Sequence, residues 1–295
     1  MTTSLGPACA RRLAKEFAAF AKDKDATYRI EPVSEDNLLK LVGKFAGAKD
    51  TPYHGGEFEL DITLEPNYPF TVPRAKFVTP VFHPNISSQT GSICLDVLQG
   101  EWSPVMGLRG LLMSVQSLLE TPNPDSPLDG VVNRVYTTDR KKYTHMVAFW
   151  THVFASPLPT AKPTADALAA VLPLLDSPVA PELESDPTRP ITVSDIQSFG
   201  LQASTVTSVV EHGWSVRQAC VGLRRAKAMG KASEVVFACE WLEERAAKAL
   251  LAAPPVVVEA VTAATTDDTK ATEKVKEEEP TAAAAPAPTI TKKDQ

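Results

Sequence analysis

Three stretches in the first third of the chain alternate between hydrophobic and polar residues with a period of two, which is the pattern of half-buried strands. The alternation is clearest over residues 57–64, where every second residue from Phe58 to Leu64 is hydrophobic. It is weaker over residues 38–46 and short over residues 74–78. We therefore predict an antiparallel meander of neighbouring strands.

Hydrophobic residues spaced three or four apart predict helices on both sides of these strands. Residues 13–20 carry one such stripe near the N-terminus. A wider stripe over residues 108–119 predicts a helix in the core of the domain. Residues 139–154 predict its last helix. Helix, meander and helices together predict an α+β domain over residues 1–155.

Proline and low-complexity segments divide the second half of the chain. Residues 156–191 are rich in proline, and we interpret them as a linker with one short helix near residues 165–172. Residues 251–295 consist mainly of alanine, threonine, proline, lysine and glutamate, and contain no aromatic residue. Such a segment buries too little surface to offset its ordering entropy, so we predict a disordered tail.

Residues 192–250 lie between the linker and the tail, and predict a small domain of three short helices. Valines over residues 206–210 mark the first helix. The second begins with Ser215 followed three residues later by Gln218, the pattern of a capping box. The third helix begins at Ser233. Its predicted inward positions are Val235, Val236, Cys239 and Leu242.

Composition narrows the class of protein. A length of 295 residues suggests about two domains. A net charge of −6 gives no support for a nucleic-acid partner. The four cysteines are widely spaced, which predicts neither a zinc site nor a disulfide framework and indicates a reducing compartment, cytosol or nucleus. The first ten residues are too polar for a signal peptide, and no apolar run reaches the ~18 residues of a membrane span.

One cysteine stands in a setting that predicts chemistry. Cys94 follows the segment His83-Pro84-Asn85 by nine residues. A thiolate is a strong nucleophile that can carry an acyl group as a thioester, and an Asn side chain has N–H donors for an oxyanion. No histidine lies between Asn85 and the following helix. A thioester carrier that passes its cargo to an amine therefore fits better than a Cys–His hydrolase.

Further motifs surround this pair. They are Thr51-Pro52-Tyr53-His54-Gly55-Gly56, Asn67-Tyr68-Pro69-Phe70, Cys94-Leu95-Asp96, Trp102-Ser103-Pro104 and Asn123-Pro124-Asp125-Ser126-Pro127. In this order and spacing, over roughly residues 7–155, they resemble the ubiquitin-conjugating enzymes. The resemblance implies the ubiquitin-conjugating (UBC) fold, a ubiquitin thioester on Cys94 and transfer to lysines. It implies no metal and no cofactor, because ATP is consumed by the upstream activating enzyme.

The resemblance also suggests roles for the neighbours of Cys94. Asn85 either donates to the oxyanion or braces the loop, and both interpretations stay open. Asp96 and the Asp125-Ser126 pair are candidates for steering and deprotonating the incoming lysine. Many members of the family have Asp where this chain has Ser126, which carries no charge unless phosphorylated. We hypothesise that Ser126 gates the lysine; a simple cap or turn serine is the alternative. His83 is expected to set the turn.

Two surfaces of the first domain match docking surfaces of the family. The ligase surface would consist of Phe70, Pro104 and Val105. The first-helix face that meets the activating enzyme and the ligase would consist of Arg11, Arg12 and Lys15, although a solvated basic face is an equally good interpretation. The implied partners are ubiquitin, the activating enzyme, RING or HECT-type ligases and protein substrates, with neither nucleic acid nor membrane.

The small second domain resembles a ubiquitin-associated (UBA) domain, with His212-Gly213-Trp214 in place of that family's Met-Gly-Phe loop. Gly213, Trp214 and Met229 would then contact ubiquitin, although Trp214 and Met229 also suit packing between helices. The spacing from Asn85 to Cys94 is one residue longer than in many members, and resembles the subgroup with such a C-terminal domain. That architecture implies the building of polyubiquitin chains for proteasomal degradation.

Two other functions stay open. An unreactive scaffold is one alternative for the first domain, but the presence of both Cys94 and Asn85 counts against it. A ubiquitin-like modifier is the other possible cargo, and the UBA-like domain favours ubiquitin instead.

Overall fold

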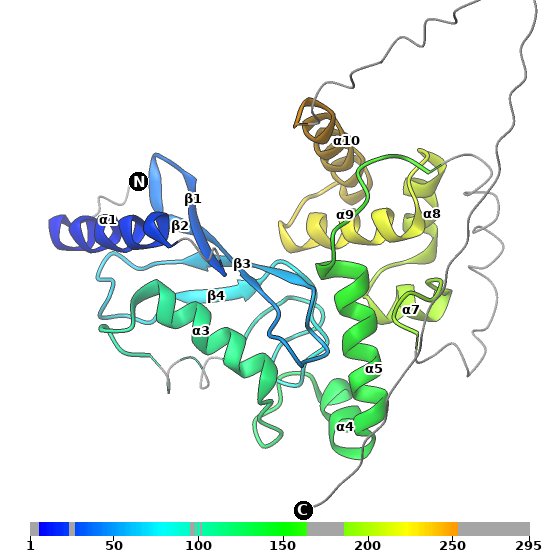
Figure 1. Cartoon of the computed structure of the whole chain (residues 1–295). Coiled ribbons are helices and arrows are strands. Elements are labelled where there is room, and N and C mark those ends of the chain that lie inside the picture. The colour runs from blue at the N-terminus through cyan, green and yellow to red at the C-terminus, as the bar shows by residue number, and fades with distance from the viewer. Residues whose placement is uncertain are drawn as a thin grey trace, which may run out of the picture. The chain divides into compact units, whose positions relative to one another are not determined.

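The computed structural model describes most of the chain (Figure 1). The described residues are 6–23, 27–94, 98, 100, 102–163 and 186–252. They belong to one compact unit, Met1–Ala253. The predicted short helix at residues 165–172 and the predicted tail beyond Ala252 lie outside the described residues.

The centre of the first domain is a four-stranded antiparallel sheet, which confirms the predicted meander. The strands follow one another in chain order and are β1 (Tyr28–Ser34), β2 (Asn37–Ala46), β3 (Glu57–Thr63) and β4 (Arg74–Phe77). The register pairs Phe45 with Phe58 and Leu60 with Phe77. These four side chains are buried, so the hydrophobic face of each strand adds to one core.

Strand β1 is the one strand of this sheet that the hydrophobic pattern does not predict. Among its residues only Ile30 is buried, because β1 lies at the edge of the sheet and most of its side chains face water. Pro32 interrupts the pattern further, and the register shifts between Pro32 and Ser34. An edge strand tolerates a proline because one side of its backbone has no partner strand.

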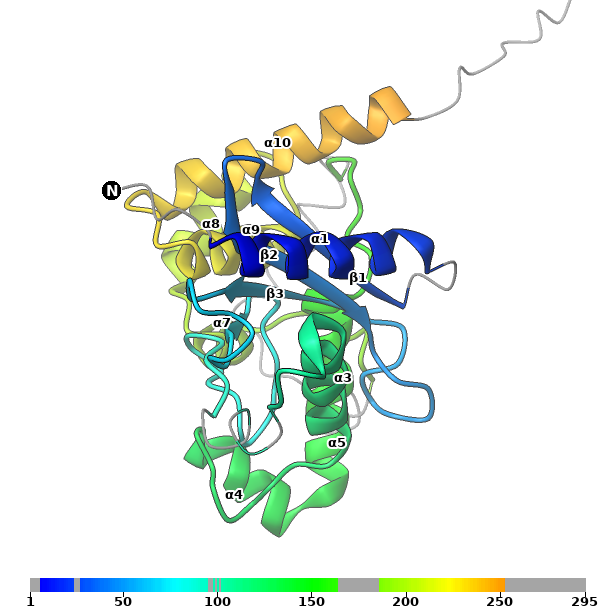
Figure 2. The ribbon, with the colours of Figure 1, turned by 90° about the vertical axis from the view of Figure 1, so that its left-hand side faces the viewer.

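Helices pack around the sheet. They are α1 (Pro7–Lys22), α3 (Gly107–Glu120), α4 (Gly130–Thr138) and α5 (Arg140–Trp150), which continues into a π-helical turn, η1 (Thr151–Ala155). Helix α1 lies across β1 (Figure 2), and α3 packs against β2. Gly43 in β2 permits this approach, because a Cβ there would lie 3.0 Å from Leu112 Cδ2 of α3 and 2.8 Å from Ile62 Cδ1. The predicted helices at residues 13–20, 108–119 and 139–154 are thereby confirmed.

Helix α4 has no counterpart in the sequence prediction. Its residues include several β-branched side chains, which have low intrinsic helix propensity. The preceding residue, Asp129, accepts hydrogen bonds from the backbone N–H groups of Val131 and Val132 and so caps the helix. Burial of Val132 and Tyr136 fixes it against the rest of the domain.

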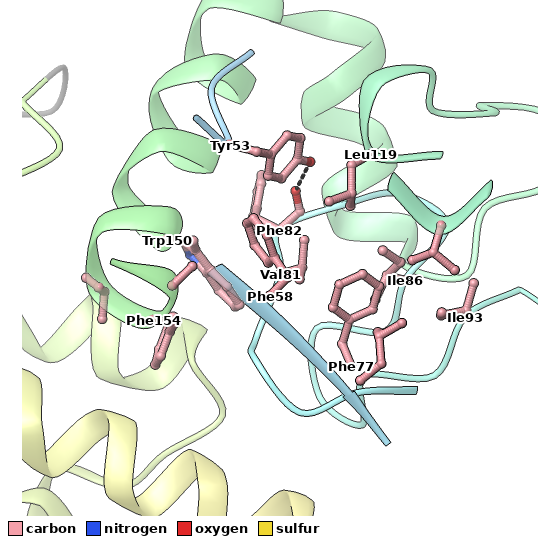
Figure 3. Packing of buried hydrophobic residues seen from close by; sticks show 14 of the residues in the cluster. Tyr53, Phe58, Phe77, Val81, Phe82, Ile86, Ile93, Leu119, Trp150 and Phe154 are labelled. Atoms are coloured by element: carbon pink, nitrogen blue, oxygen red, sulfur yellow. Dashed lines mark hydrogen bonds between the residues drawn. The ribbon is translucent and has the colours of Figure 1, made fainter. Parts of the chain in front are cut away.

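The core of the first domain extends from the sheet to the loop that carries the motif residues. Figure 3 shows Ile86 and Ile93 of that loop beside Phe77 of β4. All three side chains are buried, and Ile86 and Ile93 form an isolated antiparallel bridge. The motif loop is therefore anchored in the core on both sides of its tip.

The C-terminal part of the described chain contains the three predicted helices and one more. They are α7 (Val193–Ser198), α8 (Ala203–Glu211), α9 (Val216–Ala228) and α10 (Glu234–Ala252). The capping box between Ser215 and Gln218 is present. The short α7 was not predicted; it has its own capping box, between Thr192 and Asp195. The inward position assigned to Val236 is wrong, because this side chain is 54% exposed on α10.

The helices after residue 186 pack directly on the end of the first domain. Phe199, which follows α7, contacts the rings of Phe149, Trp150 and Phe154 at centroid distances of 6.1, 5.3 and 4.8 Å. Arg217 of α9 donates hydrogen bonds to the carbonyls of Val153 and Ser156 in and after η1, at 3.1 and 3.0 Å. An aromatic cluster and polar contacts thus hold α7–α10 against α5 and η1.

Candidate active site

Cys94 lies at the end of a hairpin-like loop that begins at Asn85. The backbone N–H of Cys94 donates to the Asn85 carbonyl at 3.0 Å. Nearer the tip, the N–H of Ser87 donates to the Ser92 carbonyl at 2.9 Å. Gly91 closes the tip with φ 74° and approaches β4 so closely that a Cβ would lie 2.0 Å from the Phe77 carbonyl oxygen. Only glycine suits that position. The close contact with β4 and the hydrogen bonds across the loop together fix the position of Cys94.

The Cys94 thiol is partly exposed and faces the Asn123–Pro127 segment across a narrow gap. Its Sγ lies 3.7 Å from the Ser126 hydroxyl oxygen. Burial raises the pKa of the thiols of Cys9, Cys220 and Cys239, and none of these three belongs to the motif loop. A raised pKa disfavours the nucleophilic thiolate. Of the four thiols, Cys94 is therefore the one placed for chemistry.

Asn85 braces the two walls of this gap. Its Nδ2 group donates to the carbonyls of Asn123 and Ser126 at 2.7 and 2.8 Å, and its Oδ1 accepts from the Asn123 backbone N–H at 2.8 Å. The side chain is fully buried. Both N–H bonds of the carboxamide are thus used by the protein, so of the two roles left open by the sequence the structure displays the bracing one.

His83 is a structural residue, as predicted. Its Nδ1 accepts from the Asn85 backbone N–H at 3.1 Å, so Nε2 carries the proton and donates to the Leu118 carbonyl of α3 at 2.9 Å. The ring is fully buried, and this desolvation lowers the pKa of His83 to about 3. Both ring nitrogens of the neutral His83 are used in hydrogen bonds that link α3 to the loop, so neither is available for acid–base catalysis.

The candidate residues for lysine steering are only partly described. Ser126 lies at the site, as given above, and Asp125 is an exposed neighbour whose backbone N–H donates to Asn123 Oδ1 at 3.0 Å. Asp96 lies outside the described residues. The structure therefore brings Cys94, Asn85 and Ser126 together.

A groove beside the site was not signalled by any motif. It has a volume of about 770 Å³ and runs along α3, with Met113, Ser117 and Asn123 among its lining residues. Met113 is 51% exposed there. Because Asn123 also contacts Asn85, the groove reaches the wall of the Cys94 gap.

A hydrogen bond from α1 links the two predicted docking surfaces. Phe70 and Val105 are 81% and 86% exposed. Arg12 donates to the Pro104 carbonyl at 2.9 Å, which joins the basic face of α1 to the segment that carries Val105. Arg11 and Lys15 are exposed on the same helix.

Glu16 is the residue that the sequence analysis missed at this surface. Its carboxylate pairs with Arg12 and accepts from the Tyr68 hydroxyl and from the Leu108 backbone N–H, the latter two at 2.8 and 2.7 Å. Glu16 thereby ties α1 to the start of α3. Its partners are 52 and 92 residues away in sequence, so no local pattern predicts them.

The loop assigned to ubiquitin binding in the three-helix part is covered in this structure. Gly213 has φ 89°, but Trp214 is only 1% exposed. The Lys162 ammonium lies 4.6 Å from the Trp214 ring centre and donates to the His212 carbonyl at 3.1 Å. Trp214 thus packs as a core residue beneath the segment before residue 164.

Met229 lies on a different, open part of the same helices. It is 51% exposed, as is the similarly hydrophobic Val236 at 54%. The hydrophobic pattern predicts Val236 in the core, and the family resemblance predicts Met229 on the binding surface. Both apolar side chains are exposed in the structure. Exposed apolar residues of this kind are candidates for a partner contact.

Two negative findings concern the described part of the chain alone. No helix there has the length and hydropathy to span a bilayer. Nor do these residues contain a group of three histidine, cysteine or carboxylate side chains arranged to hold a metal ion.

The fold and the site define an α+β domain with one reactive thiol held beside a bracing asparagine, and the family comparison agrees. The model of the ubiquitin-conjugating enzyme family matches residues 12–151. The chain is 34% identical to "Ubiquitin-conjugating enzyme E2 1" of Schizosaccharomyces pombe over 206 residues, which cover 68% of this chain and 85% of that protein. The chain belongs to the ubiquitin-conjugating enzyme family.

Other relatives match the first domain. "Ubiquitin-conjugating enzyme E2 27" of Arabidopsis thaliana is 43% identical over 49% of this chain and 75% of its own length. "Ubiquitin-conjugating enzyme E2 K" of Homo sapiens is 39% identical over 49% of this chain and 74% of its own length. As a member of this family the chain is an E2 transferase, which confirms the enzyme class predicted from the motifs.

Proposed function

We propose that Cys94 accepts ubiquitin as a thioester and passes it to lysine amines. The Cys94 thiolate attacks the thioester carbonyl on the activating enzyme, whose thiol leaves. A lysine amine then attacks the new carbonyl, so that a C–N bond forms, the C–S bond breaks and the thiol of Cys94 is released. The observation that carries this proposal is that the partly exposed Cys94 has its Sγ 3.7 Å from the Ser126 hydroxyl, at the end of the loop that Asn85 braces.

The second step requires the lysine to lose a proton. Ser126 is near enough to the thiol to contact an incoming amine, and Asp125 is an exposed carboxylate next to it. We propose that Ser126 gates the amine and that a phosphate on its hydroxyl would add about −1.5 to −2 charges at the point where many relatives have Asp. Asp96 remains a second candidate for lysine steering.

The three-helix part is proposed to bind ubiquitin as a UBA-like domain and so to favour polyubiquitin chain building for proteasomal degradation. Binding one ubiquitin close to Cys94 raises the effective concentration of its lysines. Met229 is accessible for this contact, whereas the half-buried Gly213 and the buried Trp214 would require the Lys162 segment to move aside. The activating enzyme is proposed to dock on Arg11, Arg12 and Lys15.

A RING or HECT-type ligase is proposed to dock on Phe70, Pro104 and Val105. The hydrogen bond from Arg12 to the Pro104 carbonyl and the exposure of Phe70 and Val105 support this proposal. ATP is then used by the activating enzyme, and this chain needs no cofactor of its own. We propose the cytosol or the nucleus as its location, from the wide spacing of the four cysteines in the sequence.

A loading assay tests the Cys94 proposal. The full chain is mixed with activating enzyme, ATP and ubiquitin, and separated on gels with and without reductant. We expect a reductant-labile adduct, replaced by a reductant-stable ester in Cys94→Ser and absent in Cys94→Ala. Cys239→Ala, which changes another partly exposed thiol, serves as the matched control and should load normally. An adduct that persists in Cys94→Ala would refute the assignment.

The same assay separates the alternatives. Absence of an adduct with ubiquitin but formation of one with a ubiquitin-like modifier would assign a different cargo. Absence with every modifier, using reagents that load a known E2 enzyme, would leave the scaffold. Deleting residues 192–250 tests the chain-building proposal, since loading should persist while the products become shorter.

A further inference from the structure

Arg224 is a buried cation in α9 whose guanidinium reaches out of the three-helix part into the catalytic domain. It is 5% exposed. Its Nη1 donates to the Phe199 carbonyl at 2.9 Å, and its Nη2 donates to the Ser88 carbonyl at 2.6 Å. Desolvation lowers the pKa of Arg224 to about 10, so the side chain still carries its charge at neutral pH. A buried charge with two carbonyl partners is a costly feature that packing alone does not require.

The residue that Arg224 holds lies in the motif loop itself. Ser88 stands at the tip between Asn85 and Cys94, three residues beyond the bracing asparagine. The two sides of the loop are joined next to this tip by the hydrogen bond from the Ser87 N–H to the Ser92 carbonyl. A displacement of the tip therefore acts on the two strands of the loop that end at Asn85 and Cys94.

Ser88 continues the connection to the opposite wall of the site. Its hydroxyl donates to Asp129 Oδ2 at 2.6 Å, and its backbone N–H donates to the same oxygen at 3.3 Å. The other carboxylate oxygen of Asp129, Oδ1, caps α4. The backbone N–H of Asp129 donates to the Pro84 carbonyl at 2.9 Å. Asp129 follows Ser126 by three residues, so one chain of contacts spans both sides of the Cys94 gap.

A second contact reaches the same tip. Gly200 has φ 70°, and a Cβ there would lie 2.0 Å from the Gln89 side-chain oxygen. The turn after α7 thus leaves room for Gln89 only because it has no side chain. The three-helix part thus donates a hydrogen bond to Ser88 and lies against the neighbouring Gln89.

We propose that Arg224 is a positioning residue for ubiquitin transfer from Cys94, acting through Ser88 and Asp129 on the loop that carries Asn85 and Cys94. The three-helix part then has a second task besides ubiquitin binding, because its docked α9 sets the geometry of the site. The proposal rests on the proposed thioester function of Cys94. It assigns Arg224 no contact with ubiquitin or with the reacting atoms.

The test measures single-turnover discharge of the ubiquitin thioester to free lysine, at increasing lysine concentration, with the full chain. The variants are Arg224→Gln, Ser88→Ala, their combination and Arg224→Lys. Arg217→Gln is the matched control, because Arg217 of α9 likewise donates to two backbone carbonyls, but these are Val153 and Ser156 in and after η1 and not the motif loop. Loading and thermal unfolding are measured on the same preparations.

We expect Arg224→Gln to lower the limiting discharge rate by about tenfold, since a misplacement of ~1 Å at a reacting centre can cost ~10²-fold and the loop is only loosened. The lysine concentration at half-maximal rate and the loading yield should change less than about twofold, because neither amine binding nor thiol exchange uses Arg224. Arg224→Lys should recover part of the rate, and Arg217→Gln should discharge like the wild type.

The double variant gives the sharpest outcome. If Arg224 acts through Ser88, combining Arg224→Gln with Ser88→Ala should lower the rate no further than the stronger single change, whereas independent effects multiply. Multiplying effects, a wild-type rate in Arg224→Gln, or an equal loss in Arg217→Gln would each overturn the proposal. If Arg224→Gln does not fold, a wild-type rate in Ser88→Ala overturns it instead. Failure of the wild type to load would refute the Cys94 function and is seen before discharge is measured.

Discussion

Two loops were predicted as functional sites from sequence motifs: the motif loop of the catalytic domain and the His212-Gly213-Trp214 loop of the three-helix part. They differ in which of their side chains the fold leaves exposed. In the first, the bracing residues Asn85 and His83 are fully buried while the thiol of Cys94 is partly exposed. In the second, the aromatic residue expected to bind a partner is itself buried. A motif thus marks where a site lies, and burial decides which of its side chains can meet a partner.

The largest expected effect comes from Trp214. Trp214→Ala should lower the free energy of unfolding by about 3–5 kcal/mol, because a large buried side chain leaves a cavity. Met229→Ala, an exposed position on the same helices, should change it by less than about 0.5 kcal/mol and instead weaken ubiquitin binding. Urea unfolding followed by circular dichroism and a ubiquitin titration separate the two. Unchanged stability in Trp214→Ala would show that the loop is not core.

The second-largest effect is expected at Asn85, which braces the motif loop. Asn85→Ala should still load ubiquitin but discharge to lysine about 10- to 100-fold more slowly, because the two walls of the site lose their brace and a misplacement of ~1 Å at a reacting centre can cost ~10²-fold. Asn133→Ala is the control, because Asn133 supports the same segment through one bond to the Pro124 carbonyl at 3.2 Å. Normal discharge by Asn85→Ala in a lysine discharge assay would remove Asn85 from the mechanism.

Burial of His83 predicts a dependence of stability on pH. Its folded pKa, about 3, lies below the value near 6.5 of an unfolded chain, so the unfolded state binds the proton first as the pH falls. Stability is therefore complete above pH 6.5 and should fall by about 2 kcal/mol between pH 7 and pH 5. His152, whose pKa is also lowered by burial, acts in the same direction. Urea unfolding at several pH values should show a smaller fall in His83→Gln; equal falls would contradict this account.

The smallest effect is expected at Ser126. Ser126→Ala removes the hydroxyl 3.7 Å from the thiol and should slow lysine discharge by about threefold, within the range of a single weak polar contact. Ser126→Asp, which adds a carboxylate at this position, should discharge at least as fast as the wild type. Equal or faster discharge by Ser126→Ala would leave Ser126 as a turn residue and remove the gating hypothesis.

Local patterns predicted those features whose cause lies within a few residues. The alternation from Phe58 to Leu64 predicts β3 because one face of the strand is buried. The Ser215–Gln218 capping box forms because a side chain and a backbone N–H three residues apart satisfy each other. The same reasoning failed for β1, which lies at the edge of the sheet, and for α4, a capped run of β-branched residues. It also failed for Val236, which lies on an exposed side of α10.

The sequence by itself determined the α+β class, the motif loop and Cys94 as the candidate nucleophile, because residue types at short spacing carry that information. Only the tertiary structure decided that both N–H groups of the Asn85 side chain donate to backbone carbonyls of the protein, and that Trp214 is buried. It also brought Arg224 to Ser88, 136 residues away in sequence. Such contacts depend on desolvation and on partners that meet only when distant segments pack, and no local pattern records them.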